Sequence, residues 1–430
     1  MPSKNFVYRN IRQINDGGYK VMHYKLIKFL KFIPLNIISL LIVFLIRVAS
    51  LVVIIKLSPI DGSRVGSLYA AKFYLKLKKI DGLGKKNCIY LFFIHNQFGH
   101  VNYQWLKMWK KSINILPFSL LWQRVFAINR FFPNFKKYAM YNLYALTSPE
   151  MMKKDETFIK SLKNNNLDKI TKIHHPVVEL TKDKIKIGEK FLKKTGSSNY
   201  NFLCFHARDP SYLNKSFPKR DWSYHNFRDS DIQTYVPAVQ KIAEKGITCY
   251  RMGATVEKKI NCSNPKIIDY ANSEDRSDFL DIYLSSKCRF FLCSMTGISI
   301  FPETFNRPIV YVNCYLIPQP FMNNSLFIFK KYYLNKEKRF MTFKEIYKLG
   351  KQNHAAKLRE LDIKLIDNTP EEITELVLEM NSRLNSTWEI KKEDEDLQGR
   401  FWSLFDDTFI KSNTFRIGSE YLKKNENLLF

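Results

Sequence analysis

The stretch Asn201-Phe-Leu-Cys-Phe-His-Ala-Arg-Asp209 is an apolar run that ends on an arginine and an aspartate. The residues from Phe202 to His206 have the character of a strand buried on both faces, as strands of parallel sheets are. Helix-like and strand-like segments then alternate as far as Asn313, with a strand roughly every 20 residues. This alternation predicts a doubly wound α/β domain in which right-handed crossovers build a parallel sheet.

The expected elements follow from apolar periodicity and from start and stop signals. We expect strands at 202–206, 247–252, 266–269, 289–293 and 309–312, and helices at 231–245, 277–286 and 297–305. A later helix start is signalled by Asn368-Thr-Pro-Glu-Glu-Ile373, because a capping residue precedes a proline and two carboxylates.

A chain of 430 residues is too long for a single ordinary core. Strand-like and helix-like segments also alternate before the domain described above. We expect strands at 88–94 and 113–119 and a turn-rich loop at 58–68. We therefore expect four parts. These are a basic N-terminal segment (1–50), an N-terminal Rossmann-like domain (51–190), a C-terminal Rossmann-like domain (191–345) and a C-terminal helical extension (346–430).

The net charge of +29 comes from 69 Lys and Arg against 40 Asp and Glu, with lysines spread along the chain. Such a charge suits a membrane surface, polyanions or phosphorylated substrates. Nucleic acid is not expected as a partner, because no zinc finger, aromatic-and-basic sheet signature or heptad-supported basic region is present. The seven cysteines contain no CxxC pair and indicate buried thiols in a reducing compartment rather than disulfides or a zinc site.

Residues Phe32 to Ile55 are almost continuously apolar and follow Lys20, Lys25, Lys28 and Lys31. Because Arg47 and Pro34 interrupt the segment, we favour a membrane-embedded or interfacial helix from Phe32 to Leu45 whose lysines contact anionic headgroups. The alternative is a buried core helix followed by a strand. No signal-peptide cleavage site follows, so no secretory signal is expected, and the cytoplasmic face of the membrane is the expected location.

Polar residues directly after apolar strands mark the ligand edge of a parallel sheet. Arg208 and Asp209 end the first strand, and an arginine there can bind a diphosphate through two parallel hydrogen bonds. The loop expected after Asp209 carries four basic residues, Lys215, Lys219, Arg220 and Arg228. The alternative for Arg208 is a structural ion pair with Asp209.

A second candidate is Cys293-Ser-Met-Thr-Gly-Ile298, where a strand gives way to small residues at a helix start. The hydroxyls of Ser294 and Thr296 could hold phosphate oxygens, and Gly297 would let a ligand approach the backbone. The alternative is simple N-capping by Ser294 or Thr296.

Four further residues complete the predicted donor site. Arg251 and Gly253 close the next strand and are expected to line the nucleotide pocket, with a surface arginine as the alternative. Arg276 stands in Asp275-Arg-Ser-Asp278, where helix capping by Asp275 or Ser277 is the competing explanation. Glu303 could contact a ribose or sugar hydroxyl, or face solvent.

Several groups compete for acid and base roles. His206, His225 and Asp231 lie near the first strand end, and His95 follows a strand of the other domain. The candidates for a group that accepts a proton during catalysis are His100, Asp209 and Asp229.

Several longer strings resemble a bacterial family of glycosyltransferases found with surface-polysaccharide genes. The strings are Phe205-His-Ala-Arg-Asp209, Tyr224-His-Asn-Phe-Arg-Asp-Ser-Asp231, Arg251-Met-Gly253, Arg276-Ser-Asp-Phe-Leu-Asp-Ile-Tyr283 and Phe305-Asn-Arg-Pro-Ile-Val-Tyr-Val-Asn313. The resemblance extends to 368–373, to 394–398 with Phe401-Trp402, and more weakly to Ser63-Arg-Val-Gly66. It therefore covers most of the chain beyond residue 60.

More distantly, His206-Ala-Arg208 is similar to a strand end of fucosyltransferases, and Ser294-Met-Thr-Gly297 to the phosphate loop of heptosyltransferase-type enzymes. Both likenesses imply a GT-B fold with two Rossmann-like domains, a donor site in the C-terminal one and no essential metal. Ala207 departs from the fucosyltransferase pattern, which argues against GDP-fucose as the donor.

The resulting prediction is a glycosyltransferase that moves a sugar from a nucleoside diphosphate sugar to a glycan or lipid-linked acceptor. The nucleotide sugar is a substrate, and no cofactor is expected. A non-catalytic, membrane-attached glycan-binding or assembly protein is the alternative. A nucleotide-sugar epimerase is less favoured, because no GxGxxG follows an early strand.

Overall fold

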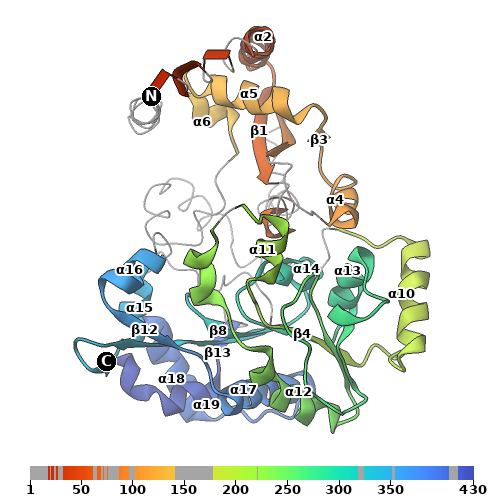
Figure 1. Ribbon diagram of the computed structural model, residues 1–430, viewed down its shortest axis with the longest axis vertical. Coiled ribbons are helices and arrows are strands. Elements are labelled where there is room, and N and C mark those ends of the chain that lie inside the picture. The colour runs from red at the N-terminus through yellow and green to blue at the C-terminus, as the bar shows by residue number, and fades with distance from the viewer. Residues whose placement is uncertain are drawn as a thin grey trace.

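The computed structural model describes residues 18–19, 21–23, 26–27, 32–61, 65–68, 71, 75, 87–95, 102–140, 178–219, 221–317, 324–350, 354–405 and 415–430. Within these ranges the chain forms two units (Figure 1). The N-terminal unit (32–140) holds a three-stranded sheet, and the main unit (178–430) holds a seven-stranded sheet and a small three-stranded one.

The main sheet is parallel throughout and has the order β13-β9-β8-β7-β4-β5-β6. Its strands are β4 (Phe202–His206), β5 (Thr248–Arg251), β6 (Ile267–Ile268), β7 (Phe291–Cys293), β8 (Ile309–Cys314), β9 (Ser325–Phe329) and β13 (Phe415–Ile417). The chain first builds outward from β4 through β5 to β6, and then crosses back to β7 and continues outward on the other side. The predicted doubly wound parallel sheet is confirmed, and its strand order reverses between β4 and β7.

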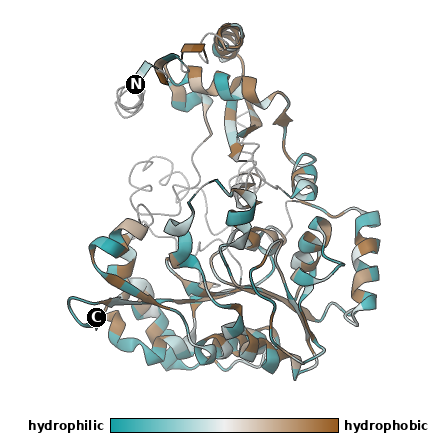
Figure 2. Ribbon diagram, in the orientation of Figure 1, coloured by the Kyte–Doolittle hydropathy of each residue, from teal (hydrophilic) through white to brown (hydrophobic). Residues whose placement is uncertain are grey.

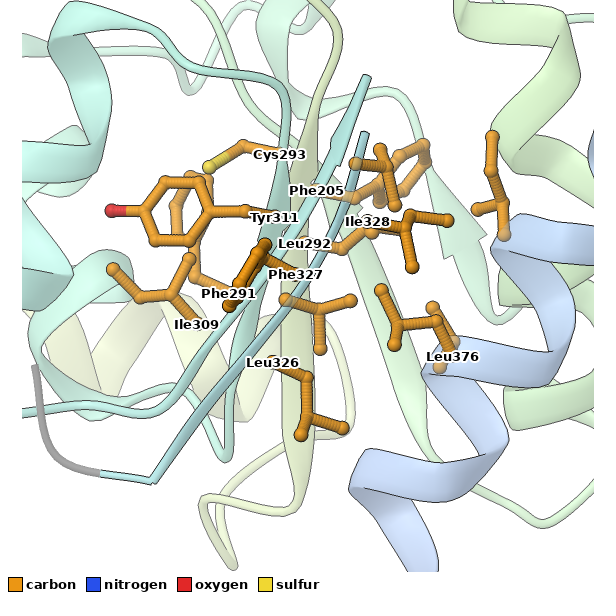
Figure 3. Packing of buried hydrophobic residues seen from close by; sticks show 14 of the residues in the cluster. Phe205, Phe291, Leu292, Cys293, Ile309, Tyr311, Leu326, Phe327, Ile328 and Leu376 are labelled. Carbon is orange, nitrogen blue, oxygen red and sulfur yellow. The ribbon is translucent and has the colours of Figure 1, made fainter. Parts of the chain in front are cut away.

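Both faces of the main sheet are apolar, because its strands carry Phe, Leu, Ile, Val and Cys at consecutive positions. Figure 3 shows Phe205, Leu292 and Leu326 of three strands on the same side of the sheet, where Leu376 of α17 (Pro370–Leu384) packs beside them. Burial of each such side chain contributes about 1.5–3 kcal/mol. The continuous apolar runs therefore require cover on two sides, and the helices supply it.

The covering helices form two groups. On the first side, α12 (Val236–Ala243) packs against α17. In the second group, α13 (Asp278–Lys287) packs against α10 (Lys182–Lys194) and α14 (Ile300–Thr304). The predicted helix at 297–305 is a 3-10 turn, η6 (Gly297–Ser299), that leads into α14.

The segment expected as a helical extension is part of the main unit. It supplies the edge strand β13, and β12 (Ile363–Ile366) pairs with β10 (Lys331–Leu334), which also pairs with β11 (Arg339–Phe340). Its helices are α15 (Phe343–Leu349), α16 (His354–Glu360), α17, α18 (Lys392–Ser403) and α19 (Ser419–Lys424). The expected start of α17 is confirmed, since Thr369 accepts a hydrogen bond from the Glu372 backbone N–H in a capping box.

The main unit begins earlier in the chain than the boundary expected at residue 190. Helix α10 packs on the main unit, where its residues Phe191 and Leu192 are buried in the core of the seven-stranded sheet. Gly188 lies so close to the Tyr283 ring of α13 that an added Cβ would fall 2.2 Å from it. Residues from Lys182 onward therefore belong to the main unit.

The N-terminal unit contains the parallel strands β1 (Ile54–Asp61), β2 (Cys88–His95) and β3 (Ile115–Leu116), in that order. Its helices are α2 (Ile33–Ala49), α4 (Tyr103–Trp109), α5 (Ser119–Asn129) and α6 (Phe135–Tyr138). The sequence suggested a loop from residue 58, but β1 runs through Asp61 because Pro59 and Ile60 remain paired with β2.

An apolar contact and a hydrogen bond join the two units. Trp105 of α4 packs edge-on against Phe301 of α14, with ring centroids 4.9 Å apart. The Asn102 side chain caps α4 by accepting from Trp105 N–H and also donates to the Asp278 carbonyl at 2.8 Å. The Asn102 side chain therefore binds both units and holds α4 of the N-terminal unit against α13 of the main unit.

All seven cysteines are unpaired, as the sequence indicates, and five of them are buried. Burial raises the pKa of the Cys204, Cys293 and Cys314 thiols well above the ordinary value. In the described part of the chain, no group of three or more His, Cys, Asp or Glu side chains is arranged to hold a metal ion.

Candidate functional site

The candidate site lies where the strand order of the main sheet reverses. Strands β4 and β7 are parallel neighbours, and His206 pairs with Cys293 at their carboxyl ends. The residues that follow, Arg208 and Ser294, therefore leave the sheet side by side. In open α/β sheets a crevice forms at such a point, because the connections on its two sides diverge to opposite faces.

Arg208 and Ser294 are joined directly, which places two of the predicted site residues in contact. The backbone N–H of Arg208 donates to the Ser294 hydroxyl at 3.0 Å. Ser294 is fully buried, so its hydroxyl orients the Arg208 backbone and does not meet solvent. The sequence predicted that this hydroxyl holds phosphate, and the structure gives it a positioning role instead.

The Arg208 side chain forms an ion pair with Asp229. The adjacent Asp209, offered by the sequence as the ion-pair partner, accepts instead from the backbone N–H groups of Ser211 and Glu257, both at 3.0 Å. Asp209 therefore closes a turn after β4 and ties it to the loop after β5. Asp229 orients the guanidinium that the sequence assigned to the diphosphate.

Two further cations, Arg228 and Lys330, lie around Asp229. The Lys330 ammonium donates to the Asp229 carbonyl and pairs with the Asp367 carboxylate, each at 2.7 Å. Arg228 donates to the Met295 carbonyl at 2.8 Å, in the loop after β7, and its guanidinium covers the Tyr315 ring at 5.4 Å.

We call Arg208, Arg228 and Lys330 the basic cluster. With Asp229 and Asp367 it contains three cations and two carboxylates, so it carries a net positive charge. Arg208 and Lys330 are each less than a tenth exposed. Cations that are partly withdrawn from water attract an anion more strongly than solvated ones, because the local dielectric is lower.

Thr296 and Gly297 form the rim of the site. Thr296 occupies the cap position of η6, but its side chain makes no capping hydrogen bond. Ser294 bonds to Arg208 rather than to the helix, so neither hydroxyl acts as the simple cap that the sequence offered as an alternative. Gly297 is exposed on the edge of the loop.

The N-terminal unit reaches this rim through η1 (Val65–Leu68), which directly follows the end of β1. A Cβ added to Gly66 would lie 3.6 Å from the Gly297 Cα, and one added to Gly297 would lie 3.8 Å from Val65. The loops that follow the first strand of one unit and the fourth strand of the other therefore touch. The two sheets point their carboxyl ends toward a common boundary, which Figure 1 shows between β1 and α11 (Ser211–Ser216).

Arg251 is almost fully buried, so the surface position suggested by the sequence is wrong. It pairs with Asp269 at 3.2 Å and donates to the Lys258 carbonyl at 3.0 Å. These bonds hold the loop after β5 against the sheet. Gly253 has a φ of +152°, and an added Cβ would fall 2.4 Å from Val256, so this position requires glycine.

His206 is enclosed beneath the same loop. Its Nδ1 donates to the Met252 carbonyl at 2.9 Å, and burial, reinforced by the nearby Arg251 and Arg208, lowers its pKa to about 4. The imidazole is therefore neutral near pH 7 and supports the loop between β5 and β6.

Arg276 and Glu303 belong to buried networks. Arg276 pairs with Asp278 and Asp281 at 3.0 and 2.6 Å, and Ser277, rather than Asp275, caps α13. Glu303 accepts from Ser299 and from Tyr311 at 2.8 and 2.9 Å and is buried, so the solvent-facing alternative is wrong.

Of the predicted acid and base groups, Asp209 and Asp229 have the partners described above, and His100 lies outside the described residues. His95 ends β2 at the boundary between the units, beside its register partner Asp61 at the end of β1. The His95 side chain is exposed. Among the described residues, His95 is thus a histidine at the carboxyl edge of the N-terminal sheet. The sequence indicated it only as one of several possible acid or base groups.

A cavity of about 520 Å³ also lies at this edge of the N-terminal sheet. Its lining is polar and apolar in nearly equal parts, and it is formed by Ile94, Lys110, Ile113, Asn114, Ile115, Leu116, Pro117, Phe118 and Ser119. Phe118 adopts a left-handed conformation with φ of +56° and is highly exposed. A bulky residue held in this region of conformational space is costly, and such strain gathers at binding sites.

The sequence did not identify Lys330 as a site residue, because β9 was not predicted. The run Ser-Leu-Phe-Ile-Phe-Lys at 325–330 ends an apolar strand on a cation, which is the same signal that identified Arg208. Arg228 was noted only as one of several basic residues in a loop.

No protein-family model and no curated protein sequence matches the chain. Among solved structures, a family 9 glycosyl transferase from Veillonella parvula is similar with a TM-score of 0.35 and 10% identity, over 64% of this chain and 86% of that one. A protein assigned as a UDP-N-acetylglucosamine 2-epimerase from Listeria monocytogenes is similar with a TM-score of 0.25 and 12% identity, over 78% and 98% of the two chains.

Proposed function

We propose that the chain is a glycosyltransferase of the GT-B type that moves a sugar from a nucleoside diphosphate sugar to an acceptor hydroxyl. The observation that carries this proposal is the bond between Arg208 and Ser294 at the reversal of strand order. It supports a donor site, because it fixes the backbone of Arg208 at the edge where parallel sheets bind nucleotides. The resemblance of the segments at 205–209, 224–231, 276–283 and 305–313 to surface-polysaccharide glycosyltransferases agrees with this role.

The basic cluster would stabilise the leaving group. When the bond between the sugar and the diphosphate breaks, negative charge grows on the departing oxygen, and preorganised cations stabilise it without having to reorganise. Arg208 can give two parallel hydrogen bonds to a phosphate, whereas Lys330 supplies a point charge. Gly297 leaves room for phosphate oxygens beside the loop backbone, and Thr296 offers a hydroxyl at the same rim.

The acceptor would bind on the N-terminal unit. Its hydroxyl oxygen forms the new bond to the anomeric carbon, the bond to the diphosphate breaks, and a base takes the hydroxyl proton. His95 and His100 are the proposed candidates for this base, because they are the histidines at or after the end of β2. Asp209 and Asp229 are better assigned to holding the loop and Arg208.

The cavity next to β3 would hold a lipid-linked acceptor. Its isoleucine, leucine and phenylalanine side chains suit part of an acyl or isoprenoid chain, and the Lys110 ammonium suits an attached phosphate. In this proposal the enzyme builds a lipid-linked surface polysaccharide at the cytoplasmic face of a bacterial inner membrane.

The test is to incubate the full chain with a panel of nucleoside diphosphate sugars, with and without a bacterial lipid extract. Release of nucleoside diphosphate and transfer of labelled sugar into the lipid fraction are measured together. Transfer that requires the extract supports the proposal. Binding of nucleotide without any turnover would favour a non-catalytic glycan-binding protein, and conversion of the sugar nucleotide without an acceptor would favour an epimerase.

A further inference from the structure

Helix α2 presents an entirely apolar outer surface. Its exposed residues are Ile33, Pro34, Ile37, Ile38, Leu40, Leu41, Phe44, Leu45 and Val48. Leu51 and Val52, in the turn that follows, are 88% and 75% exposed. We call these eleven residues the α2 face. Figure 2 shows the helix largely brown, at the end of the N-terminal unit opposite the main sheet.

Two polar residues of α2, Ser39 and Arg47, are turned toward the protein. Ser39 is buried and donates to the Leu35 carbonyl. Arg47 donates to Asn129 at 2.9 Å and to the Pro133 carbonyl at 3.0 Å, and its guanidinium covers the Phe132 and Tyr138 rings. A surface helix of a water-exposed protein has the opposite arrangement, with apolar residues inward and polar residues outward.

The apolar surface continues on neighbouring elements. Phe131 and Phe132, between α5 and α6, are exposed, as are Phe118 and Leu120 at the start of α5. Helix α5 packs against α2, and Phe132 contacts the Arg47 guanidinium of α2. A contiguous apolar surface of this kind marks a site of contact with a partner or a membrane.

The charge of the N-terminal third identifies the partner. Residues 1–149 contain 23 Lys and Arg against three acidic residues, Asp16, Asp61 and Asp81, which gives a net charge of +20 out of the total of +29. The exposed cations Arg130, Lys136 and Lys137 lie in or next to α6. In the sequence, four lysines lie within twelve residues before α2. An apolar strip edged by cations is the pattern that binds anionic bilayers.

We propose that the α2 face lies in the boundary between headgroups and acyl chains of an anionic lipid bilayer, with the helix parallel to the membrane surface. The exposed apolar residues enter the acyl region, and the surrounding lysines and arginines contact lipid phosphates. This inference rests on α2 and on the charge distribution, and it does not depend on the proposed enzymatic function.

The geometry favours a helix on the membrane over one across it. Helix α2 has 17 residues, which at 1.5 Å per residue span roughly 25 Å, less than the roughly 30 Å of a hydrocarbon core. In the part of the chain described, no helix is both long and apolar enough to cross a bilayer. Arg47 also ties the inner side of α2 to α5 and α6, so insertion across the bilayer would break bonds to a charged group.

The same charge argues against a second copy of the chain as the occupant of the α2 face. A twofold contact through this face would bring together two N-terminal thirds, in each of which residues 1–149 carry a net charge of +20. An anionic membrane removes this repulsion by supplying the opposite charge.

The test is flotation of the full chain with vesicles of phosphatidylcholine alone or of phosphatidylcholine mixed with phosphatidylglycerol. The wild type is expected to float with the mixed vesicles and to bind less at high salt. The double variant Leu41→Glu, Phe44→Glu places two carboxylates in the middle of the α2 face and should bind about tenfold more weakly or worse. The matched control is Ile390→Glu with Leu361→Glu, two exposed apolar residues of the main unit that should leave binding unchanged.

Three results would overturn the proposal. They are a wild type that stays unbound with mixed vesicles, an α2 variant that floats as well as the wild type, and a loss of binding in the control equal to that in the α2 variant. Light scattering on the same samples measures the oligomeric state and tests whether a second copy of the chain covers the α2 face. A dimeric wild type with a monomeric α2 variant would assign the face to a second copy. Both altered α2 residues are exposed, so the thermal midpoint of unfolding should be unchanged.

Discussion

The Ser294 hydroxyl accepts a hydrogen bond from the backbone N–H of Arg208, at 3.0 Å, across the junction of β4 and β7. The bond joins two segments that are 86 positions apart in the chain, at the place where the strand order reverses. The start of the Arg208 loop is thereby tied to the start of the Met295–Gly297 loop. Any anion bound between them would meet two loops that are fixed relative to each other.

Replacing Ser294 with alanine should both destabilise the fold and weaken nucleotide binding. It leaves the buried Arg208 N–H without its acceptor, at a cost of about 1–3 kcal/mol in the free energy of unfolding. Urea unfolding measures the stability, and calorimetric titration with nucleoside diphosphates measures the affinity. Ser286→Ala removes another buried hydroxyl, bonded to the Tyr283 carbonyl, and should lower stability without changing affinity. Equal affinities for all three proteins would contradict the role given to Ser294.

Lys330→Met should weaken binding of nucleoside diphosphates by about tenfold or more, because a buried cation beside Asp229 is lost while the side-chain length is kept. The dependence of affinity on salt should fall at the same time. Lys331→Met is the matched control, since the adjacent side chain pairs with Glu372 at 2.7 Å. If both variants bind like the wild type, Lys330 does not belong to the donor site.

Two glycines should respond differently to alanine. At Gly297 an added Cβ would make only an ordinary contact with Val65 at 3.8 Å, so Gly297→Ala should be as stable as the wild type but bind nucleotide more weakly. At Gly253 the left-handed φ and the Val256 contact predict a loss of about 1–3 kcal/mol in stability. Differential scanning calorimetry and titration separate the two effects. Undiminished binding by a stable Gly297→Ala protein would remove Gly297 from the ligand contact.

His206 should make stability depend on pH. Burial lowers its folded-state pKa to about 4 from the ordinary 6.5, so between these values the unfolded chain binds a proton that the folded chain does not. Its contribution is present above pH 6.5 and is lost as the pH falls toward 4, by about 3 kcal/mol. His206→Gln keeps a donor for the Met252 carbonyl and should lose less stability on acidification. Urea unfolding of both proteins across this range measures the difference, and parallel curves would refute it.

The sequence predicted the central strands well because they are fully buried. The run Phe202–His206 was placed correctly, and the strand starting at Ile309 was also identified, since a parallel strand covered on both faces needs continuous apolar residues. The edge strand β13 was missed, because it is three residues long and pairs with β9 across about 90 intervening positions. Such pairing is determined by the sheet and not by local pattern.

The candidate site was predicted in outline and not in detail. Strand-end position placed Arg208 and Ser294 at the same edge of the sheet, because parallel strands end at the same edge, and the structure shows that their strands are neighbours. The sequence does not show which carboxylate pairs with Arg208, because Asp209 and Asp229 are both available nearby. Asp209 accepts hydrogen bonds from two backbone N–H groups in the turn after β4, and Asp229 is the ion-pair partner. Likewise, Arg251 stands at a strand end in the sequence, yet it is the last residue of β5 and its side chain is buried in an ion pair with Asp269.

The most direct test of the account is the affinity of nucleoside diphosphates for wild type, Arg208→Lys and Arg208→Ala, measured by calorimetric titration. UDP, GDP, CDP, ADP and dTDP form the panel, and Arg400→Ala, an exposed arginine paired with Glu426, is the control. We expect one nucleotide to bind the wild type and the control equally, to bind Arg208→Lys at least about tenfold more weakly because a lysine cannot form the two parallel bonds, and not to bind Arg208→Ala. Binding of that nucleotide to a folded Arg208→Ala protein with unchanged affinity would contradict the donor site proposed here.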